Sequence, residues 1–456
     1  MRRPTIRALV GGAAGIAASI AGGIALTSLP AASLPPTSGS QALEVAHVPP
    51  VLRAPGEPVT LRYAIVCAPR EDGEPCRGSG EVYVRAGQSG SYDRLELRRG
   101  EDSEEGRYYV DLPPRIAASP DGFSYYAVLH DEGSRTAATV PSGGAAAPQR
   151  SFPLGKPVHI DLGAHAFGHA RTRDARVVAA PWGSDAGEAG LAGTRELGYV
   201  GPSSFDVSSD GSVTLLDQVN ARVEWWLHGR ASTTPVTASG GIADFAVEPD
   251  GSFDVLEPPN RTTTAPVLRH FRRDGAVEWV RRLADRTWAK LALGPDGAVV
   301  QQQPSEEWLP VAVDGRPLGR VEQAARGRPG LPTGHGREVL VARVGSGELR
   351  LAEVAGNAVL AGWQITSTTP LGEVQLAEPL GSGLVVVVKT YTDDRDEFLA
   401  LVLDRSGVAQ RFSVTSAQWA ETAPLARFRL AGPSLYELGS TASGAFVDRF
   451  DLEVPR

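Results

Sequence analysis

Lysine, methionine and cysteine are almost absent from this chain of 456 residues. Lysine occurs only at Lys156, Lys290 and Lys389, and the single methionine is the first residue. Arginine supplies most of the positive charge, but it is scattered among acidic residues in a chain of net charge −8. Nucleic-acid binding requires a basic stripe or patch, so the sequence predicts no nucleic-acid partner.

Sequence motifs for cofactors and catalytic nucleophiles are also missing. The chain has no phosphate loop, no dinucleotide-binding fingerprint and no nucleophile elbow. His165 and His169 have a spacing that suits zinc on a helix, and His159 is near, but the flanking glycines argue against a helix. We therefore expect these histidines to pack at a junction between elements. The sequence predicts neither a cofactor nor a metal ion.

Only two cysteines occur. Cys67 ends the apolar run LRYAIVC, and Cys76 precedes the next alternating segment, with APREDGEP between them. No histidine or further cysteine is near them in the sequence, which disfavours a metal site. The pattern predicts a hairpin disulfide, and the alternative is two free thiols.

Charge is absent from a long segment near the N-terminus. Arg2, Arg3 and Arg7 precede an uncharged run at 8–29 that is rich in Ala, Gly, Ile and Leu. This layout is typical of a signal peptide, although the run is also long enough to cross a bilayer as an anchor. Residues 1–42 are thus predicted to be an export signal or membrane anchor with a spacer. The protein is expected to be extracytoplasmic, and to meet a membrane only through an uncleaved N-terminal segment.

What the chain has in abundance is glycine (52) and proline (35), together with 42% hydrophobic residues. A turn-rich apolar chain of this length favours an all-β fold with more than one domain. Residues 43–150 carry short alternating segments between turns, for example at 58–66, 81–86 and 123–131. This spacing predicts a small β-sandwich. The pair RYYVDLPP and DGFSYYAVLHDEGSRTAATVP resembles the closing strands of a fibronectin type III or immunoglobulin-like module.

A repeat follows. SFDVSSDGSVTLLD at 204–217, DFAVEPDGSFDVLE at 244–257 and AKLALGPDGAVVQQ at 289–302 share one pattern of strand, glycine turn and strand. Further glycine turns alternate with these. Two hairpin turns in a unit of roughly 40 to 50 residues are typical of a four-stranded propeller blade. Counting the later, degenerate units predicts a six-bladed β-propeller over 170–456, with 151–169 as a linker.

The last unit ends at Glu453 after only three strands, whereas DARVVAAPWG at 174–183 stands alone before the first unit. This orphan segment is predicted to pair into the last blade and close the ring. Closure would remove two open sheet edges that would otherwise invite aggregation.

One unit carries a family resemblance. The stretch GPSSFDVSSDGSVTLLDQVNARVEWW at 201–226 resembles the NHL repeat, with Asp217, Asn220 and Arg222 at the polar positions of that pattern. The resemblance covers one blade well. It implies a structural role for these three residues, which would tie the turn between the second and third strands to the neighbouring blade.

Enzymes built on six-bladed propellers generally hold a metal on the central axis, with ligands from the starts of the innermost strands. The expected opening positions are Ser203, Ala243, Trp288, Leu331, Glu373 and Leu425. One carboxylate in six positions cannot build a calcium or zinc shell, which disfavours metal catalysis.

The sequence therefore predicts a non-enzymatic binding or scaffold protein with a protein or carbohydrate ligand. Its binding face should use the connections between blades and the loops that join second to third strands. The candidate ligand-binding residues are Arg222, Arg261, Arg286, Trp288, Trp308, Arg395 and Trp419. The alternative is a propeller-type hydrolase or lyase that acts on a sugar, lactone or peptide, which clustered carboxylates or histidines in the central channel would favour.

The disulfide is directly testable. We expect mass spectrometry of the exported protein to find Cys67 and Cys76 linked, because the compartment is oxidising and the loop between them is short. For so short a loop the chain-entropy model gives the bond on the order of 2 to 3 kcal/mol. Two alkylatable thiols in exported protein would refute the prediction.

Overall fold

The structure is a computed structural model. It describes residues 43–66, 78–100, 106–132, 136–236, 244–258, 265–283, 288–302, 307–313, 315–420 and 425–456. The predicted N-terminal signal and both cysteines lie outside these residues. In the described part of the chain, no helix is long and apolar enough to cross a membrane.

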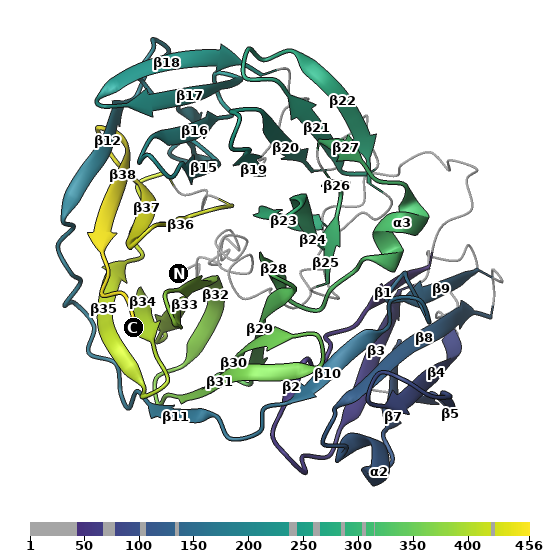
Figure 1. Cartoon of the computed structure of the whole chain (residues 1–456). Helices are drawn as coiled ribbons and strands as arrows, with labels where there is room; N and C mark the ends of the chain where they lie inside the picture. The colour runs from purple at the N-terminus through teal and green to yellow at the C-terminus, as the bar shows by residue number, and fades with distance from the viewer. Residues whose placement is uncertain are drawn as a thin grey trace, which may run out of the picture. The chain divides into compact units, whose positions relative to one another are not determined.

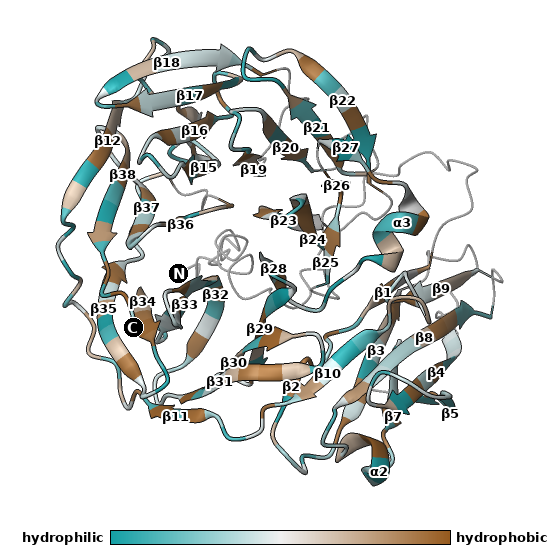
Figure 2. Ribbon diagram, in the orientation of Figure 1, coloured by the Kyte–Doolittle hydropathy of each residue, from teal (hydrophilic) through white to brown (hydrophobic). Residues whose placement is uncertain are grey.

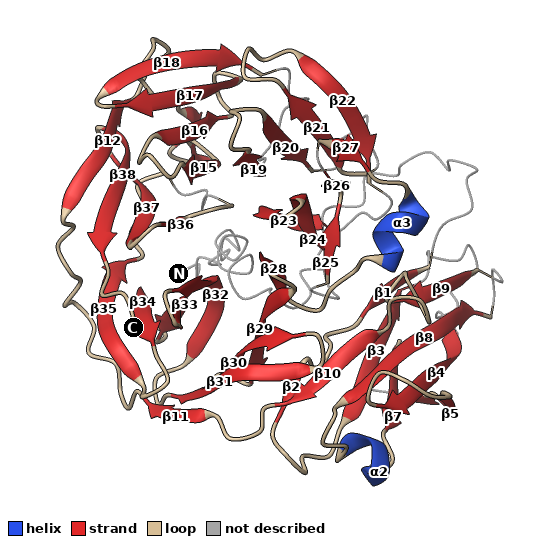
Figure 3. Cartoon of the chain, viewed as in Figure 1, coloured by secondary structure: helices blue, strands red, loops and turns tan. Residues whose placement is uncertain are grey.

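The described chain is nearly all-β, as the composition predicts (Figure 3). Only two short helices break the succession of strands: α2 at Pro114–Ala117 and α3 at Arg320–Ala325.

The first part of the described chain forms two sheets. One has the order β1-β3-β7-β6, with strands Glu44–Ala46, Thr60–Val66, Arg107–Asp111 and Arg98–Arg99. The other has the order β2-β10-β8-β4-β5, with strands Leu52–Arg53, Gln149–Pro153, Phe123–Asp131, Gly78–Ala86 and Asp93–Glu96, and β9 (Ala137–Val140) pairs with β8.

Both of these sheets contribute to a single hydrophobic core. Leu61 and Tyr63 from β3 and Val82 and Tyr125 from β4 and β8 are among its buried members. His47 lies in the same core, where Nε2 is 2.7 Å from the hydroxyl of Tyr125 and Nδ1 is 2.7 Å from the carbonyl oxygen of Arg62. Burial lowers the pKa of His47 to about 4, so the ring is neutral in the folded protein.

The rest of the chain is a succession of separate antiparallel sheets. The first two have the orders β15-β16-β17-β18 and β19-β20-β21-β22. Their strands are Ser204–Val207, Val213–Asp217, Arg222–Leu227 and Arg230–Pro235, then Asp244–Val247, Phe253–Glu257, Val267–Phe271 and Val277–Arg282. The predicted Asp-Gly hairpins are present, and Gly211 and Gly251 adopt the positive φ values of 80° and 86° that such turns need.

The third unit differs from the predicted four-stranded pattern. Among the described residues its sheet has β23 (Trp288–Gly294), β24 (Gly297–Gln302) and β25 (Trp308–Pro310), and the predicted outer hairpin is a separate pair, β26 (Ala312–Val313) with β27 (Arg316–Pro317). Short minor strands β13 (Ala192–Thr194) and β14 (Gly198–Val200) form a hairpin ahead of the first unit.

The last three sheets have the orders β11-β31-β30-β29-β28, β32-β33-β34-β35 and β12-β38-β37-β36. Their strands from β28 onward are Leu331–Gly334, Arg337–Val344, Glu348–Ala355, Ala358–Thr366, Leu371–Leu380, Gly383–Tyr391, Asp396–Leu403, Val408–Thr415, Phe428–Ala431, Ser434–Thr441 and Gly444–Asp451. The strand β12 is Ala175–Pro181, and β11 is Val158–Asp161.

The innermost strands of these sheets follow one another in a cycle (Figure 1). The strand pairs in contact are β15 with β19, β19 with β23, β23 with β28, β29 with β32, β32 with β36, and β36 with β15. Separate antiparallel sheets around a common centre are the arrangement of a β-propeller. The outer strands β12, β22 and β35 carry both apolar and polar residues (Figure 2). Exposed and less exposed residues alternate along parts of β12 and β22, since one side of each strand faces solvent.

The orphan segment pairs as the sequence predicts. β12 is antiparallel to β38, with Ala175 opposite Arg449 and Pro181 opposite Gly444. Val178 and Ala180 point into a core shared with Phe205 and Leu215 of the next sheet. The chain therefore brings an early strand and its last strand together in one sheet.

The region expected to be a linker is structured. β11, within 151–169, lies parallel to β31 and adds a fifth strand to that sheet. Just before it, β10 (Gln149–Pro153) crosses the predicted boundary between the sandwich and the linker. β11 pairs in parallel with β31, about 200 residues later in the sequence. Local sequence patterns do not predict a pairing between segments so far apart.

The first β-rich part, residues 43–153, contacts the β28–β31 sheet through apolar and charged side chains. Leu52 and Phe152 pack against Leu340 and Val354 in one apolar cluster. Beside this cluster, the buried guanidinium of Arg350 lies 2.6 Å from the Glu57 carboxylate. The first β-rich part is thus fixed to the β28–β31 sheet by apolar and charged contacts together.

Strand β12 provides a test of ring closure. Val178 is 1% exposed, so Val178→Ala should lower the free energy of unfolding by about 2 kcal/mol through lost burial and a residual cavity. Urea denaturation measures this. Ala179→Ser, at the adjacent exposed position of the same strand, should have no effect. Equal midpoints for the two variants would contradict a closing role for β12.

Candidate functional site

Two regions of the propeller gather polar or aromatic side chains: the central axis and one rim. The axis is lined by the first strand of each sheet, whose inner edge has no β partner. The rim consists of the connections between sheets and the loops from second to third strands. Antiparallel order places those loops at one end of the sheets and the first hairpin turns at the other.

At the axis, aspartates from two neighbouring sheets bond the backbone of the next strand. Asp206 on β15 accepts a hydrogen bond of 2.8 Å from the backbone N–H of Val247 on β19. Asp244 on β19 accepts one of 2.8 Å from the N–H of Leu291 on β23. Asp244 also accepts the Ser204 hydroxyl at 2.7 Å. The two carboxylates therefore join three successive sheets.

Arg429 on β36 completes this axial cluster. Its Nε donates to the Phe205 carbonyl at 2.9 Å, and Nη2 donates to the Phe245 carbonyl at 3.2 Å. Nη2 is also 3.5 Å from the Asp244 carboxylate. Burial raises the pKa of Asp206, while Arg429 and two backbone N–H groups oppose that shift. The Arg429 guanidinium thus donates hydrogen bonds to backbone carbonyls of β15 and β19, and its positive charge offsets the negative charge of Asp244.

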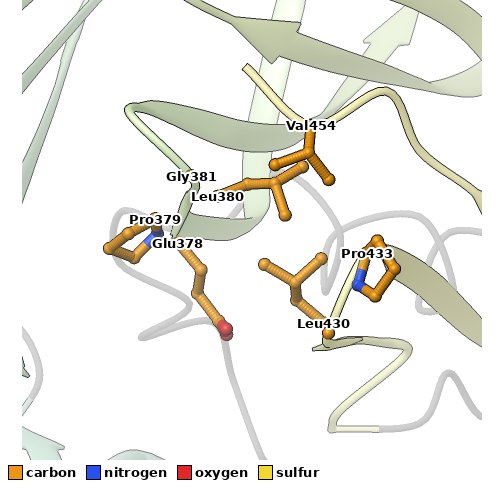
Figure 4. Close-up of a pocket in the computed structure, with 8 residues that line it drawn as sticks. Glu378, Pro379, Leu380, Gly381, Leu430, Pro433 and Val454 are labelled. Atoms are coloured by element: carbon orange, nitrogen blue, oxygen red, sulfur yellow. The ribbon is translucent and has the colours of Figure 1, made fainter. Parts of the chain in front are cut away.

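Glu378 on β32 is the one axial carboxylate with no hydrogen bond to another described residue. Burial raises its pKa to about 7, with Arg429 lowering it and Asp206 raising it. Its side chain borders an open hollow of about 610 Å³. Leu380, Leu430 and Val454 converge on this hollow, whereas the carboxyl end of Glu378 extends away from Val454 (Figure 4).

The expected inventory of axial positions needs correction. The strands β15, β19, β32 and β36 open at Ser204, Asp244, Leu371 and Phe428, instead of the expected Ser203, Ala243, Glu373 and Leu425. Glu373, the one expected carboxylate, is exposed and pairs with Lys290 at 3.5 Å. The axis therefore holds more ionisable groups than the sequence indicates. A slip of one residue in β19 changes which side chain starts the strand.

The NHL-like residues hold a loop that belongs to the closing strand's segment. Asp217 accepts hydrogen bonds from Asn220 at 2.7 Å and from the Gly190 N–H at 3.1 Å. Asn220 donates to the Gly183 carbonyl at 2.9 Å. Arg222 donates to the carbonyls of Ser184, Asp185 and Glu188 and pairs with Asp217 and Glu224. These contacts tie the turn to residues 183–190. The Arg222 guanidinium is occupied by structural hydrogen bonds and ion pairs, which leaves little of it to contact a ligand.

The other predicted ligand-binding residues do not form one site. Arg261 and Arg286 lie outside the described residues, as does the side chain of Trp288 on β23. Trp308 is half-buried on β25, and its backbone pairs with Arg328. Arg395 is exposed next to Asp394, on the loop between β33 and β34.

Trp419 belongs to a cluster of three aromatic rings. Its ring stacks on Tyr199 with centroids 4.5 Å apart and an interplanar angle of 12°. The Trp182 ring centroid lies 6.0 Å from that of Trp419, and the Trp182 indole N–H donates to the Thr441 carbonyl at 3.0 Å. All three rings are half-buried, and Leu197, on the turn of the β13–β14 hairpin, is 85% exposed. We call Trp182, Tyr199 and Trp419 the rim aromatic cluster.

The cluster has free polar groups and a rigid support. In the described structure, the Tyr199 hydroxyl and the Trp419 indole N–H have no hydrogen-bond partner. Trp182 immediately precedes Gly183, the first residue of the loop that Asn220 and Arg222 hold. Sequence reasoning found Trp419 but missed Trp182 and Tyr199. The sequence does carry a signal for Trp182, because this residue directly follows β12, at the start of a connection between sheets.

The three histidines are separate. His165 Nε2 is 2.9 Å from the Glu397 carboxylate on β34, with both side chains buried, whereas His159 and His169 are exposed. The position of His165 fits the expected junction role. Within the described ranges, no group of three or more His, Cys, Asp or Glu side chains is placed to hold a metal ion.

Asp244 offers a test of the axial bonds. Asp244→Asn should lower the free energy of unfolding by about 3 kcal/mol, because one oxygen that accepts the Leu291 or Ser204 hydrogen bond becomes a donor. Asp210→Asn, in an exposed turn, is the matched control. A thermal melt with unchanged midpoint in Asp244→Asn would show that these bonds do not join the sheets.

Comparison with known proteins gives structural likeness only. The chain matches no protein-family model and no curated protein. Among solved structures it is similar to virginiamycin B lyase from Staphylococcus aureus (9% identity, 55% of this chain and 95% of that chain, TM-score 0.32). It is also similar to a streptogramin B lyase (11%, 73% and 90%, TM-score 0.30) and a puromycin hydrolase (17%, 73% and 50%, TM-score 0.30). Likenesses this distant assign no activity to the chain.

Proposed function

We propose that this chain is an exported, non-enzymatic binding protein whose rim aromatic cluster contacts the ligand. In this proposal the propeller has six blades, whose inner strands are β15, β19, β23, β28, β32 and β36, with β12 closing the last. The two sheets before it form a β-sandwich around their common core. The localisation rests on the arginine-led apolar run at 8–29.

The observation that carries the proposal is the convergence of three aromatic rings from two connections on one rim. Trp182 and Tyr199 come from the connection between β12 and β15, and Trp419 comes from the connection between β35 and β36, more than 200 positions later. The rings lie within 6.0 Å of each other in two successive pairs. Aromatic side chains with free polar groups are enriched at binding sites, because they offer apolar area and a hydrogen bond together. This rim is the face that the blade topology predicts for binding.

The axis supports binding over catalysis for a separate reason. Asp206, Asp244 and Arg429 already bond the backbone of neighbouring strands, so a reaction that used them would cost the contacts between sheets. A saccharide or a protein surface is the ligand class that flat aromatic area suits, since both present CH groups and hydrogen-bond acceptors.

One observation favours the alternative, a hydrolase or lyase. Glu378 borders the open hollow between β32 and β36 and has a pKa of about 7, which suits a general acid or base near neutral pH. No second catalytic group faces it with the geometry of a base and its orienting partner in the described chain. The binding role therefore remains the better supported proposal.

A binding screen with matched variants tests the proposal. The purified chain is applied to a glycan array and to an array of extracellular protein fragments, and hits are measured by titration. Trp419→Ala should weaken the hit at least tenfold, as expected for a central aromatic contact. Trp279→Ala is the control, because Trp279 is also half-buried but stacks on His270 in another sheet. Binding that survives Trp419→Ala and Tyr199→Ala, or turnover of a hit, would overturn the proposal.

A further inference from the structure

A second, smaller hollow lies between the β23–β25 sheet and the β28–β31 sheet and contains none of the rim aromatic residues. It is bordered by the first hairpin turns of two neighbouring sheets, at Gly294–Gly297 and Gly336–Arg337, and by the residues that follow α3. Its volume is about 210 Å³. At about 30 Å³ for each water molecule, this equals the space of roughly seven waters, so only a small ligand fits.

A buried carboxylate with an unpaired oxygen lines this hollow. Glu338 on β29 is 6% exposed, and its Oε1 lies 2.8 Å from Arg150. Its other oxygen, Oε2, has no hydrogen-bond partner among the described residues. A buried charged acceptor without a donor is costly, and such groups in folded proteins are commonly satisfied by water or a ligand.

An arginine in the same hollow lacks a close ion pair. Arg326 and Arg337 are each neutralised by a carboxylate, Glu322 at 3.0 Å and Glu353 at 2.9 Å. The nearest carboxylate to Arg328 in the described chain is Glu338, at 3.8 Å, which is beyond hydrogen-bond distance and which Arg150 already engages. Nη1 of Arg328 donates to the backbone carbonyls of Arg326 and Gly327, at 3.1 and 2.9 Å, whereas Nη2 has no hydrogen-bond partner among the described residues. The remaining neighbour, Glu307, is buried, and burial raises its pKa to about 8, so it is mostly uncharged at neutral pH.

The hollow therefore presents both signs of charge over an apolar floor. Arg328 offers the N–H groups of Nη2, since Nη1 bonds backbone carbonyls. Glu338 and the exposed Asp296, which has no ion pair in the described chain, offer carboxylate oxygens. Val299, Pro310 and Pro332 supply the apolar floor. A ligand that matches this set carries an anionic and a cationic group close together on a small apolar body.

We propose that this hollow binds a free α-amino acid, with the ligand carboxylate on Arg328 and the ligand ammonium group on Asp296 and Glu338. A guanidinium is the side chain best suited to a carboxylate, since its planar N–H groups match the two oxygens. Opposite charges in one small site select a zwitterion over either of its halves. This site shares no residue with the rim aromatic cluster.

Titration calorimetry on the full chain with L-alanine, sodium acetate and ethylamine tests the proposal. L-Alanine should bind saturably, and acetate and ethylamine, which are its two charged halves, should bind at least tenfold more weakly. Arg328→Gln and Asp296→Asn should each weaken L-alanine binding at least tenfold. Both residues are exposed, so these variants are expected to fold, and circular dichroism checks that they do.

Two control variants outside the hollow test whether the loss of L-alanine binding is specific to this site. Arg343→Gln, at an exposed arginine of β29 outside the hollow, should bind L-alanine as the unmodified chain does. Trp419→Ala should do so too, because it alters only the rim. The proposal is overturned if L-alanine does not saturate, if acetate binds equally well, or if Arg328→Gln binds normally.

Discussion

The inner edges of the first strands impose the constraint on which the propeller depends. β15 and β19 each pair with a strand on one side only, so their other edge presents backbone N–H and carbonyl groups to the axis. Such groups need partners when they are shielded from water. Asp206 and Asp244 accept N–H groups of the next sheet, and Arg429 donates to the carbonyls of Phe205 and Phe245. Side chains therefore join sheets that share no backbone ladder.

The structural hydrogen bonds of Asp206, Asp244 and Arg429 limit the groups at the axis that could take part in function. A carboxylate that holds a neighbouring strand is poorly suited to coordinate a metal or move a proton, because either role would remove a bond between sheets. Among the axial acids of the described residues, Glu378 alone makes no hydrogen bond to a neighbouring strand. Aromatic residues gather instead at the rim, where Asp217, Asn220 and Arg222 hold the loop that follows Trp182. Asp217, Asn220 and Arg222 thus have a structural role, and by holding this loop they also help to position the rim aromatic cluster.

The first β-rich part is an integral neighbour of the β28–β31 sheet. Leu52 and Phe152 share an apolar cluster with Leu340 and Val354, while Arg350 meets Glu57 beside it. A flexible spacer would need neither contact. The same junction brings Arg150 of β10 to Glu338, and Arg328 has no carboxylate of the described chain within hydrogen-bond distance in the small hollow. The composition of that hollow is therefore a consequence of how the two parts meet.

By itself the sequence determined the all-β class, the hairpin turns and the pairing of β12 with β38, because alternation, Asp-Gly turns and a missing fourth strand are local signals. It also marked Asp217, Asn220 and Arg222 through their spacing after a turn. Only the tertiary structure decided that Asp244 and Arg429 meet at the axis, that β11 joins β31, and that Trp182 and Tyr199 stand beside Trp419. Those contacts join residues up to hundreds of positions apart, and a one-residue change in where a strand begins alters which side chain takes part. Local periodicity fixes the strands, whereas the position of each strand start against its neighbour is set by packing between sheets.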